Sequence, residues 1–367
     1  MVELFQFELG QVCSRLSSGK GISAKEVHEI GEYPVYGGNG LRGYTDQSNF
    51  EGECAIIGRQ GAYCGNVRYF SGAAYMTEHA VVLCANEKND TRYLAYLLSI
   101  MNLGRLSGQS AQPGLSVKSL AKQIVSLPSL SEQKIMADTL SALDEKIENN
   151  SKINHHLEQM AEAIFKSWFT EFEPTKPFTS IVQVLGGGTP QTNTAEYWNG
   201  RIPFFTPKDA IETYVLSTEK SLTESGLNNC NSRLYPVNTV FVTARGTVGK
   251  LAMAGAPMAM NQSCYALVGN AGYGQYFVYH LALKTVESLK HKASGAVFDA
   301  IVTRDFESEI VPAPSVESVW VFEEKVAPFY KAILNNLKES ARLAAIRDAL
   351  LPRLMSGELS VADMDTK

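Results

Sequence analysis

The chain has 367 residues, of which 45% are hydrophobic and 10% aromatic, a composition that excludes a disordered chain. At about 100–200 residues per domain, this length predicts two or three domains. The formal net charge is −5, but the acidic excess is concentrated in residues 131–172, which hold 4 basic and 8 acidic residues. Residues 1–130 and 173–315 each hold 11 of both signs, so either segment can still present a basic face to a nucleic acid.

Targeting signals and redox chemistry point to the cytoplasm. The sequence has no apolar run of about 18 residues, and its first residues lack the basic head and apolar run of a secretory signal. The six cysteines form no Cys-x-x-Cys pair and have no histidine at zinc-ligand spacing. We therefore expect a cytoplasmic protein with reduced thiols, no membrane association and no metal site.

The chain repeats itself at an offset of 186 residues. Three pairs of motifs share this offset, and Leu157 and Leu343 keep the same register. The paired motifs begin at Arg59 and Arg245, at Val125 and Val311, and at Ile147 and Ile333. The sequence therefore predicts two copies of one unit, each with two parts.

The first part of each copy, residues 1–130 and 173–315, is predicted to be a sheet-rich α+β domain. Short apolar runs alternate with glycine-rich turns, and helical stretches intervene. The predicted strands include residues 54–57, 80–83, 239–243 and 265–268, and the predicted helices include residues 91–98 and 275–289.

The second part of each copy, residues 131–172 and 316–360, is predicted to be a long helix, followed at the end of the chain by a short tail, residues 361–367. The first segment has no glycine or proline, whereas Pro328 predicts a break near the start of the second. Two such helices in one chain favour antiparallel pairing as a coiled coil, which gives the whole chain an internal pseudo-two-fold repeat.

The predicted coiled-coil seam contains matched positions from both helices. They are Ile147, Asn150 and Leu157 in the first helix and Ile333, Asn336 and Leu343 in the second. Asn150 and Asn336 are either polar residues tolerated at a helix edge or a pair that sets the register of the two helices.

The motifs of several enzyme classes are missing. The sequence has no Pro-Pro pair of the kind that amino-methyltransferases use at their target base. The nearest approach to a P-loop, residues 244–251, has alanine at the first glycine and leucine at the hydroxyl position. We assign no catalytic residue, metal ligand or cofactor to this chain. Two similar domains joined by helices suit a ligand with repeating geometry, such as two half-sites on DNA.

Over nearly its whole length the sequence resembles the specificity subunits of type I restriction-modification systems. The resemblance rests on five motifs taken in order. They are the Arg-Gly turns at 59–65 and 245–249, Gln112-Pro-Gly-Leu-Ser116, the Leu127–Gln133 segment that opens the first helix, Gly186-Gly-Gly-Thr-Pro190 and the Leu350–Leu359 ending. The first copy departs from the pattern with Ser18-Gly-Lys-Gly21 in place of Gly-Gly-Thr-Pro, and the second with Pro314-Ser-Val-Glu-Ser318 at its helix start.

The resemblance implies two target-recognition domains, residues 1–130 and 173–315, each followed by a helical spacer. It implies that the chain is not an enzyme, and that it reads an asymmetric bipartite site on double-stranded DNA. It also implies that two copies of an adenine-N6 methyltransferase subunit dock on the spacers, and that a pair of translocase-nuclease subunits can join. S-adenosylmethionine, ATP and magnesium would then be bound by those partners.

The candidate DNA contacts lie in loops of both domains. In the first domain they are Lys20, Gly38, Asn39, Arg59, Gln60 and Tyr63, and in the second they are Thr206, Lys208, Thr243, Arg245, Lys250 and Gln262. Arg59 and Arg245 either contact phosphate or guanine, or pair with a local carboxylate while the glycines form a tight turn. For the other positions, the alternative is an ordinary exposed loop residue.

Two other functions stay open at this point. One is a DNA-binding protein that works without a methyltransferase, which exposed apolar residues on the paired helices would argue against. The other is an enzyme with an unrecognised site, which a pocket with convergent carboxylates or a metal would support.

Overall fold

A computed structural model of the chain describes residues 2–107, 114–270, 272–292 and 300–360. The predicted tail, 361–367, and residues 112 and 113 of the Gln112–Ser116 motif lie outside the described residues. The chain divides into two compact units: unit 1 comprises Met1–Lys146 and Arg342–Lys367, and unit 2 comprises Ile147–Ala341. Both boundaries fall inside the predicted long helices. Each unit therefore contains one sheet-rich domain and one end of each helix.

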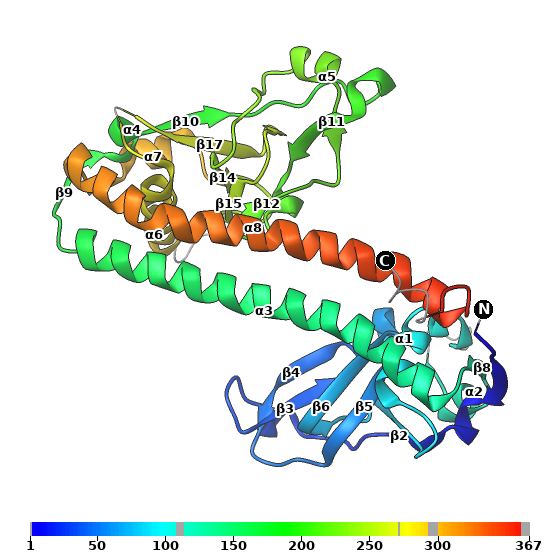
Figure 1. Cartoon of the computed structure of the whole chain (residues 1–367). Coiled ribbons are helices and arrows are strands. Elements are labelled where there is room, and N and C mark those ends of the chain that lie inside the picture. Colours follow the sequence, from blue (N-terminus) through cyan, green and yellow to red (C-terminus); the bar gives the residue numbers. More distant parts are fainter. Residues whose placement is uncertain (1, 108–113, 271, 293–299, 361–367) are drawn as a thin grey trace. The chain divides into compact units, whose positions relative to one another are not determined.

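Unit 1 is built on a six-stranded sheet with the strand order β2-β7-β5-β6-β3-β4 (Figure 1). Its strands are β2 (Cys13–Ser18), β3 (Tyr33–Gly37), β4 (Gly40–Thr45), β5 (Phe50–Gly58), β6 (Val67–Met76) and β7 (Ala80–Ala85). A separate two-stranded sheet pairs β1 (Phe5–Glu8) with β8 (Ile124–Leu127), and the helices are α1 (Thr91–Ser99) and α2 (Val117–Ala121). The strands predicted at 54–57 and 80–83 and the helix predicted at 91–98 are confirmed.

Different clusters of buried hydrophobic side chains lie on the two faces of this sheet. Ala55, Ile57 and Leu83 pack with α1 in the larger core. Because strand residues alternate between faces, Cys54 and Ile56 point to the other side, where they meet Met76 at the far end of β6. Gly52 and Gly72 lie opposite each other on β5 and β6, with φ of +117° and +129°, so both strands can bend at this point.

Unit 2 repeats this plan with more broken strands. Its five-stranded sheet has the order β10-β17-β14-β15-β12, and a three-stranded sheet has the order β13-β11-β16. The strands are β10 (Val182–Gly186), β11 (Trp198–Phe205), β12 (Tyr214–Val215), β13 (Ser221–Leu222), β14 (Val240–Thr243), β15 (Leu251–Ala254), β16 (Ala259–Met260) and β17 (Cys264–Gly269). A further pair joins β9 (Pro174–Pro177) to β18 (Ile310–Pro312), as β1 joins β8 in unit 1. The helices are α4 (Phe178–Ile181), α5 (Glu224–Asn228), α6 (Gln275–Lys292) and α7 (Thr303–Ser308).

The two long helices, α3 (Leu130–Phe169) and α8 (Val316–Met355), each have 40 residues. The predicted break at Pro328 is wrong, because α8 continues through this residue. The side chains of Phe322, Val326, Tyr330 and Ile333 are all fully buried on either side of Pro328, and this packing holds the helix across the missing N–H.

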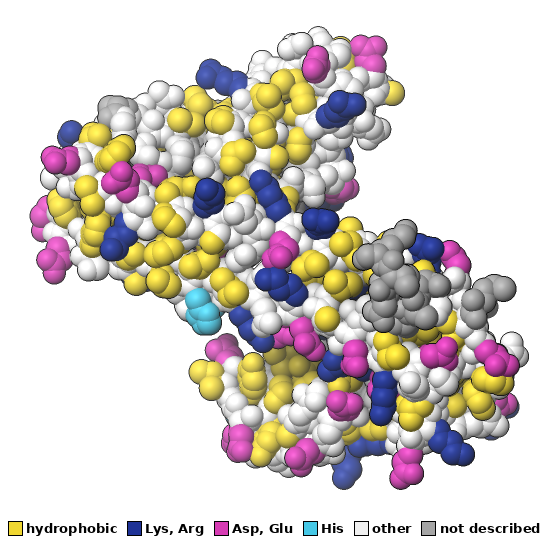
Figure 2. Space-filling view, viewed as in Figure 1, with side chains coloured by type: hydrophobic (Ala, Val, Ile, Leu, Met, Phe, Trp, Pro, Cys, Tyr) yellow, Lys and Arg dark blue, Asp and Glu magenta, His cyan; other side chains and the backbone are white. Residues whose placement is uncertain are grey.

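Within unit 2 the helices run antiparallel, as predicted. Asn150 Nδ2 donates to Ser340 Oγ at 3.2 Å, and Asn336 Nδ2 donates to Asn154 Oδ1 at 2.8 Å. Asn150 is only 1% exposed, so it lies inside the helix pair rather than at its edge. Hydrophobic side chains also reach the surface where the helices pass through unit 2 (Figure 2).

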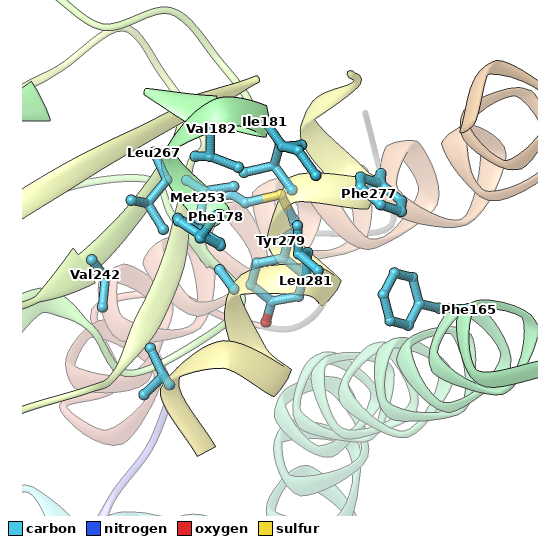
Figure 3. Packing of buried hydrophobic residues seen from close by; sticks show 14 of the residues in the cluster. Phe165, Phe178, Ile181, Val182, Val242, Met253, Leu267, Phe277, Tyr279 and Leu281 are labelled. Atoms are coloured by element: carbon cyan, nitrogen blue, oxygen red, sulfur yellow. The ribbon is translucent and has the colours of Figure 1, made fainter. Parts of the chain in front are cut away.

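The ends of both helices are part of the unit 2 core. Phe165 of α3 lies 5.7 Å from Phe277 of α6 between ring centroids (Figure 3). Phe169 of α3 lies 5.4 Å from Phe322 of α8. Phe165 and Phe169 are buried, whereas Phe172, in the same aromatic run, is 44% exposed. Fully burying such aromatic side chains contributes about 1.5–3 kcal/mol each, so the helices and the domain stabilise one another.

One partly buried carboxylate joins α8 to α6. Glu323 Oε1 accepts a hydrogen bond from the Phe277 backbone N–H at 2.7 Å, in the first turn of α6. Burial raises the pKa of Glu323 to about 7, although the backbone N–H groups of Phe277 and Tyr276 act in the opposite direction. The protonated form is therefore favoured in the folded unit, and this contribution to stability is lost as the pH rises through about 7.

We predict that Glu323→Gln changes stability in a pH-dependent way. The amide keeps the acceptor oxygen but cannot ionise, so the variant should match the wild type near pH 5 and be more stable near pH 8. Urea unfolding of the full chain at both pH values measures the difference. Glu324→Gln, at the exposed neighbouring position, is the control and should show no such pH dependence. Equal effects of Glu323→Gln at both pH values would contradict the prediction.

Candidate nucleic-acid interface

Three turns of unit 1 converge on a fourth, the β6–β7 turn at residues 76–80. Lys20 N donates to Met76 O at 2.9 Å, which attaches the turn after β2. Thr77 N donates to Tyr36 O at 2.9 Å, which attaches the β3–β4 turn, and Arg59 N donates to His79 O at 3.0 Å, which attaches the β5–β6 turn. These bonds are all between backbone atoms, so the arrangement does not depend on the side chains that the turns carry. We call these four turns the turn cluster of unit 1.

Unit 2 contains the same cluster, centred on residues 260–263 between β16 and β17. Gly188 N donates to Met260 O at 3.2 Å, Asn261 N donates to Phe205 O at 3.0 Å, and Arg245 N donates to Ser263 O at 3.2 Å. Each bond corresponds to one in unit 1. The predicted sequence repeat is therefore also a repeat of backbone hydrogen bonds.

The residues predicted as DNA contacts in the first domain all lie in the turn cluster of unit 1. Lys20, Asn39 and Gln60 are exposed, and Tyr63 is 45% exposed. Arg59 is half-buried, and its Nη1 donates to Ser18 Oγ at 3.4 Å. The structure thus brings together residues that are up to 43 positions apart in the sequence.

The six residues predicted in the second domain lie in or beside the turn cluster of unit 2. Arg245 and Lys250 are exposed, whereas Lys208 pairs with Glu219 at 3.6 Å. Thr206 caps the short turn that follows it through Asp209. Gln262 accepts a hydrogen bond from the Thr189 hydroxyl of the Gly-Gly-Thr-Pro motif.

Thr243 has a different position from the other predicted contacts. Its side chain is fully buried, and its hydroxyl accepts a hydrogen bond from Lys250 N at 2.9 Å and donates to Thr247 O. These bonds close the turn that carries Arg245. Thr243 therefore holds the turn in shape and is not available to a ligand at the surface.

Glycines permit the close approach of these turns in both units. A Cβ at Gly38 would lie 2.8 Å from His79 O, and a Cβ at Gly187 would lie 2.2 Å from Asn261 O. In both cases the opposing atom belongs to the backbone of the central turn, which cannot move aside without breaking the cluster. A Cβ at the neighbouring Gly186 would meet no heavy atom within 4 Å.

Several basic side chains of unit 1 have no acidic partner. Among the described residues, no carboxylate lies within 4.0 Å of a charged nitrogen of Lys20, Arg42, Arg59 or Arg68. Elsewhere in unit 1, Arg92 and Arg347 are paired, at 3.2 Å from Glu145 and 2.6 Å from Asp144. The turn cluster thus combines uncompensated cations with exposed amides and an aromatic ring, which are the groups that contact phosphates and base edges.

Two of these cations, Arg42 and Arg68, were not among the predicted contacts. Arg42 follows the Gly37–Gly40 turn by two residues, so a hairpin prediction at that turn would have placed it nearby. Arg68 gave no signal, because it lies on a strand and approaches the turn only in the folded structure.

One cleft of unit 2, about 580 Å³ in volume, does contain two carboxylates, Glu158 and Glu212. The Glu158 carboxylate accepts a hydrogen bond from the Thr213 hydroxyl, and burial followed by the charge of Glu158 raises the pKa of Glu212. The part of the chain that the structure describes has no group of three metal-ligating side chains. It also has no helix with the length and hydropathy needed to cross a membrane.

The sequence matches the type I restriction modification DNA specificity domain twice, over residues 1–159 and 171–346. The chain belongs to this family. Each match contains one turn cluster. The prediction of a specificity subunit, whose role is DNA recognition and not catalysis, is therefore confirmed. The unit 2 cleft with Glu158 and Glu212 lies in a subunit of this kind.

Relatives and a solved structure agree with this membership. The chain is 24% identical over 328 residues to the Type I restriction enzyme HindI specificity subunit of Haemophilus influenzae, covering 67% of this chain and 71% of that protein. It is 26% identical over 303 residues to the MjaIX specificity subunit of Methanocaldococcus jannaschii, covering 75% and 70%. The crystal structure of the type I restriction-modification S subunit from M. genitalium shares the fold, with a TM-score of 0.68 at 17% identity and 96% of both chains covered.

We predict that Gly187→Ala and Gly186→Ala, two neighbouring substitutions in one loop, have opposite outcomes. Gly187→Ala should separate the loop from the central turn of unit 2 and weaken specific DNA binding by the assembled complex at least tenfold. Gly186→Ala should leave binding unchanged, because a Cβ there meets open space. Fluorescence anisotropy with cognate duplex measures both. Equal affinities for the two variants would show that the close approach at Gly187 is not needed for binding.

Proposed function

We propose that this specificity subunit reads an asymmetric, bipartite DNA site and directs an adenine-N6 methyltransferase subunit to it. Each turn cluster reads one half of the site. Two methyltransferase subunits bind one copy of this chain, and two restriction subunits can join the complex. The catalytic activity belongs to those partner subunits, which bind S-adenosylmethionine, ATP and magnesium.

The observation that carries the proposal is the repetition of one backbone framework with different side chains. The corresponding backbone bonds hold Arg59 and Arg245 at matched turns, whereas His79 of unit 1 is matched by Ser263 of unit 2. Two recognition surfaces that share a backbone but differ in side chains suit two half-sites that differ in sequence. The two long helices, each with one end in each unit, serve as the spacer between the half-sites.

The helices themselves favour a protein partner over a DNA-binding protein that acts alone. Ile153 and Met160 of α3 are 46% and 49% exposed, and because they are seven residues apart they lie on one face of the helix. Trp320 of α8 is 59% exposed. Exposed apolar side chains of this size on a spacer are typical of a surface that another protein covers. The acidic excess of residues 131–172 also suits a protein partner better than phosphate.

The proposal is tested by co-expressing the chain with the methyltransferase subunit of its source and mapping N6-methyladenine by single-molecule sequencing. The wild type should produce a new bipartite motif. Arg59→Ala and Arg245→Ala should each weaken or relax one half of that motif and leave the other half intact, with a loss of about 1–3 kcal/mol in binding for each contact.

The outcomes separate the alternatives. Stable assembly of the two proteins without any new methylation would contradict the proposed reading of DNA. Failure of the two proteins to assemble would favour a DNA-binding protein that acts alone. Loss of both halves of the motif from a single arginine substitution would contradict the assignment of one half-site to each turn cluster.

A further inference from the structure

Two arginines of unit 1 rest on the glycine turn between β3 and β4. A Cβ at Gly40 would lie 2.4 Å from Arg68 Nη1, and a Cβ at Gly37 would lie 2.8 Å from Arg42 Cδ. The absence of side chains at both glycines therefore leaves room for the two arginine side chains. Arg68 belongs to β6 and Arg42 to β4, so two strands direct guanidinium groups to one turn.

The position of this turn in the sheet makes it accessible. The pair β3–β4 forms an antiparallel ribbon, and β4 is the last strand of the six-stranded sheet. A two-stranded ribbon is one of the shapes that the major groove of B-DNA admits. The turn also contacts the rest of the cluster, since a Cβ at Gly38 would lie 3.3 Å from Arg59 N.

The charges of Arg42 and Arg68 are not compensated inside unit 1. Both side chains are exposed, and no carboxylate of the described residues lies within ion-pair distance of either. Burial and the neighbouring Tyr44 raise the pKa of Tyr36, and the charge of Arg68 acts in the opposite direction. A buried polar atom also lies beside the turn: Thr77 Oγ1 has no hydrogen-bond partner, and a Cβ at Gly37 would lie 3.5 Å from it.

The described residues of unit 2 hold no equivalent pair of arginines. The turn that follows Phe205 carries Lys208, which is paired with Glu219. The strand that follows Lys250, β15, has the sequence Leu-Ala-Met-Ala, with no basic residue. The two turn clusters therefore differ at this place.

We propose that Arg42 and Arg68 determine base specificity in the half-site that unit 1 reads, each donating two hydrogen bonds to O6 and N7 of a guanine in the major groove. This inference rests on the proposed function. It identifies a guanine-containing half-site for unit 1 and assigns its recognition to two residues outside the matched Arg-Gly turns. Unit 2 has no arginine at the described positions that correspond to Arg42 and Arg68, so it does not read its half-site through this pair.

The experiment uses the full chain co-expressed with the methyltransferase subunit. Arg42→Ala, Arg68→Ala and Arg68→Lys are compared with the wild type by motif mapping and by binding to duplexes with single base changes. Arg68→Ala should relax one guanine position in one half of the motif and lower affinity for the cognate site roughly 5- to 150-fold. Arg68→Lys should lose nearly as much, because an ammonium cannot donate the paired bonds of a guanidinium.

Lys88→Ala is the matched control for lost charge, because Lys88 is exposed and follows the end of β7 that is remote from the turn cluster. It should leave the motif unchanged. Thermal unfolding verifies that each variant is folded.

Three results would overturn the inference. An equal loss of affinity for all sequences, or full rescue by lysine, would show a phosphate contact. An unchanged motif and affinity in Arg42→Ala and Arg68→Ala would show no contact. A wild-type complex that produces no bipartite motif would overturn the proposed function, and this inference with it.

Discussion

The recognition surface of each unit depends on backbone hydrogen bonds to one short turn. In unit 1 the residues from Met76 to His79 accept or donate three such bonds, and in unit 2 the residues from Met260 to Ser263 do the same. Because backbone groups alone form these bonds, the side chains of the converging turns can change while the turns stay together. Glycines such as Gly38 and Gly187 are required where two backbones approach too closely for a Cβ. This separates the residues that hold the surface together from those that can read a ligand.

The two long helices link the two units along the chain. Their ends are packed into the cores of the two units, with Phe165 and Phe169 in one and Met136 and Leu140 in the other. The middle of the helix pair is more polar, with Asn150 bound to Ser340 and Asn336 bound to Asn154. Each long helix therefore contributes to the cores of both units.

Much of this fold could be predicted from the sequence, because strands, helices and the repeat each leave a local or periodic signal. The strands at 54–57 and 265–268 are short apolar runs before glycine-rich turns, and the 186-residue offset revealed the duplication. The break expected at Pro328 failed because tertiary packing of Tyr330 and its neighbours outweighs the local cost of proline. Burial of Thr243 and the approach of Arg68 to Gly40 depend on how distant strands meet, which no single stretch of sequence records. The matched Arg-Gly turns could be identified from the sequence, whereas the place of Arg68 beside the β3–β4 turn could not.

The most direct test of the account asks which DNA each turn cluster touches. Gln60 and Gln262, exposed or partly exposed members of the two clusters, are each replaced by the photo-crosslinking residue p-benzoylphenylalanine in the full chain assembled with its methyltransferase. After irradiation on cognate duplex, the crosslinked bases are mapped by sequencing. Position 60 is expected to crosslink within one half of the bipartite site and position 262 within the other. Crosslinks from both positions to the same half, or outside both halves, would contradict this expectation.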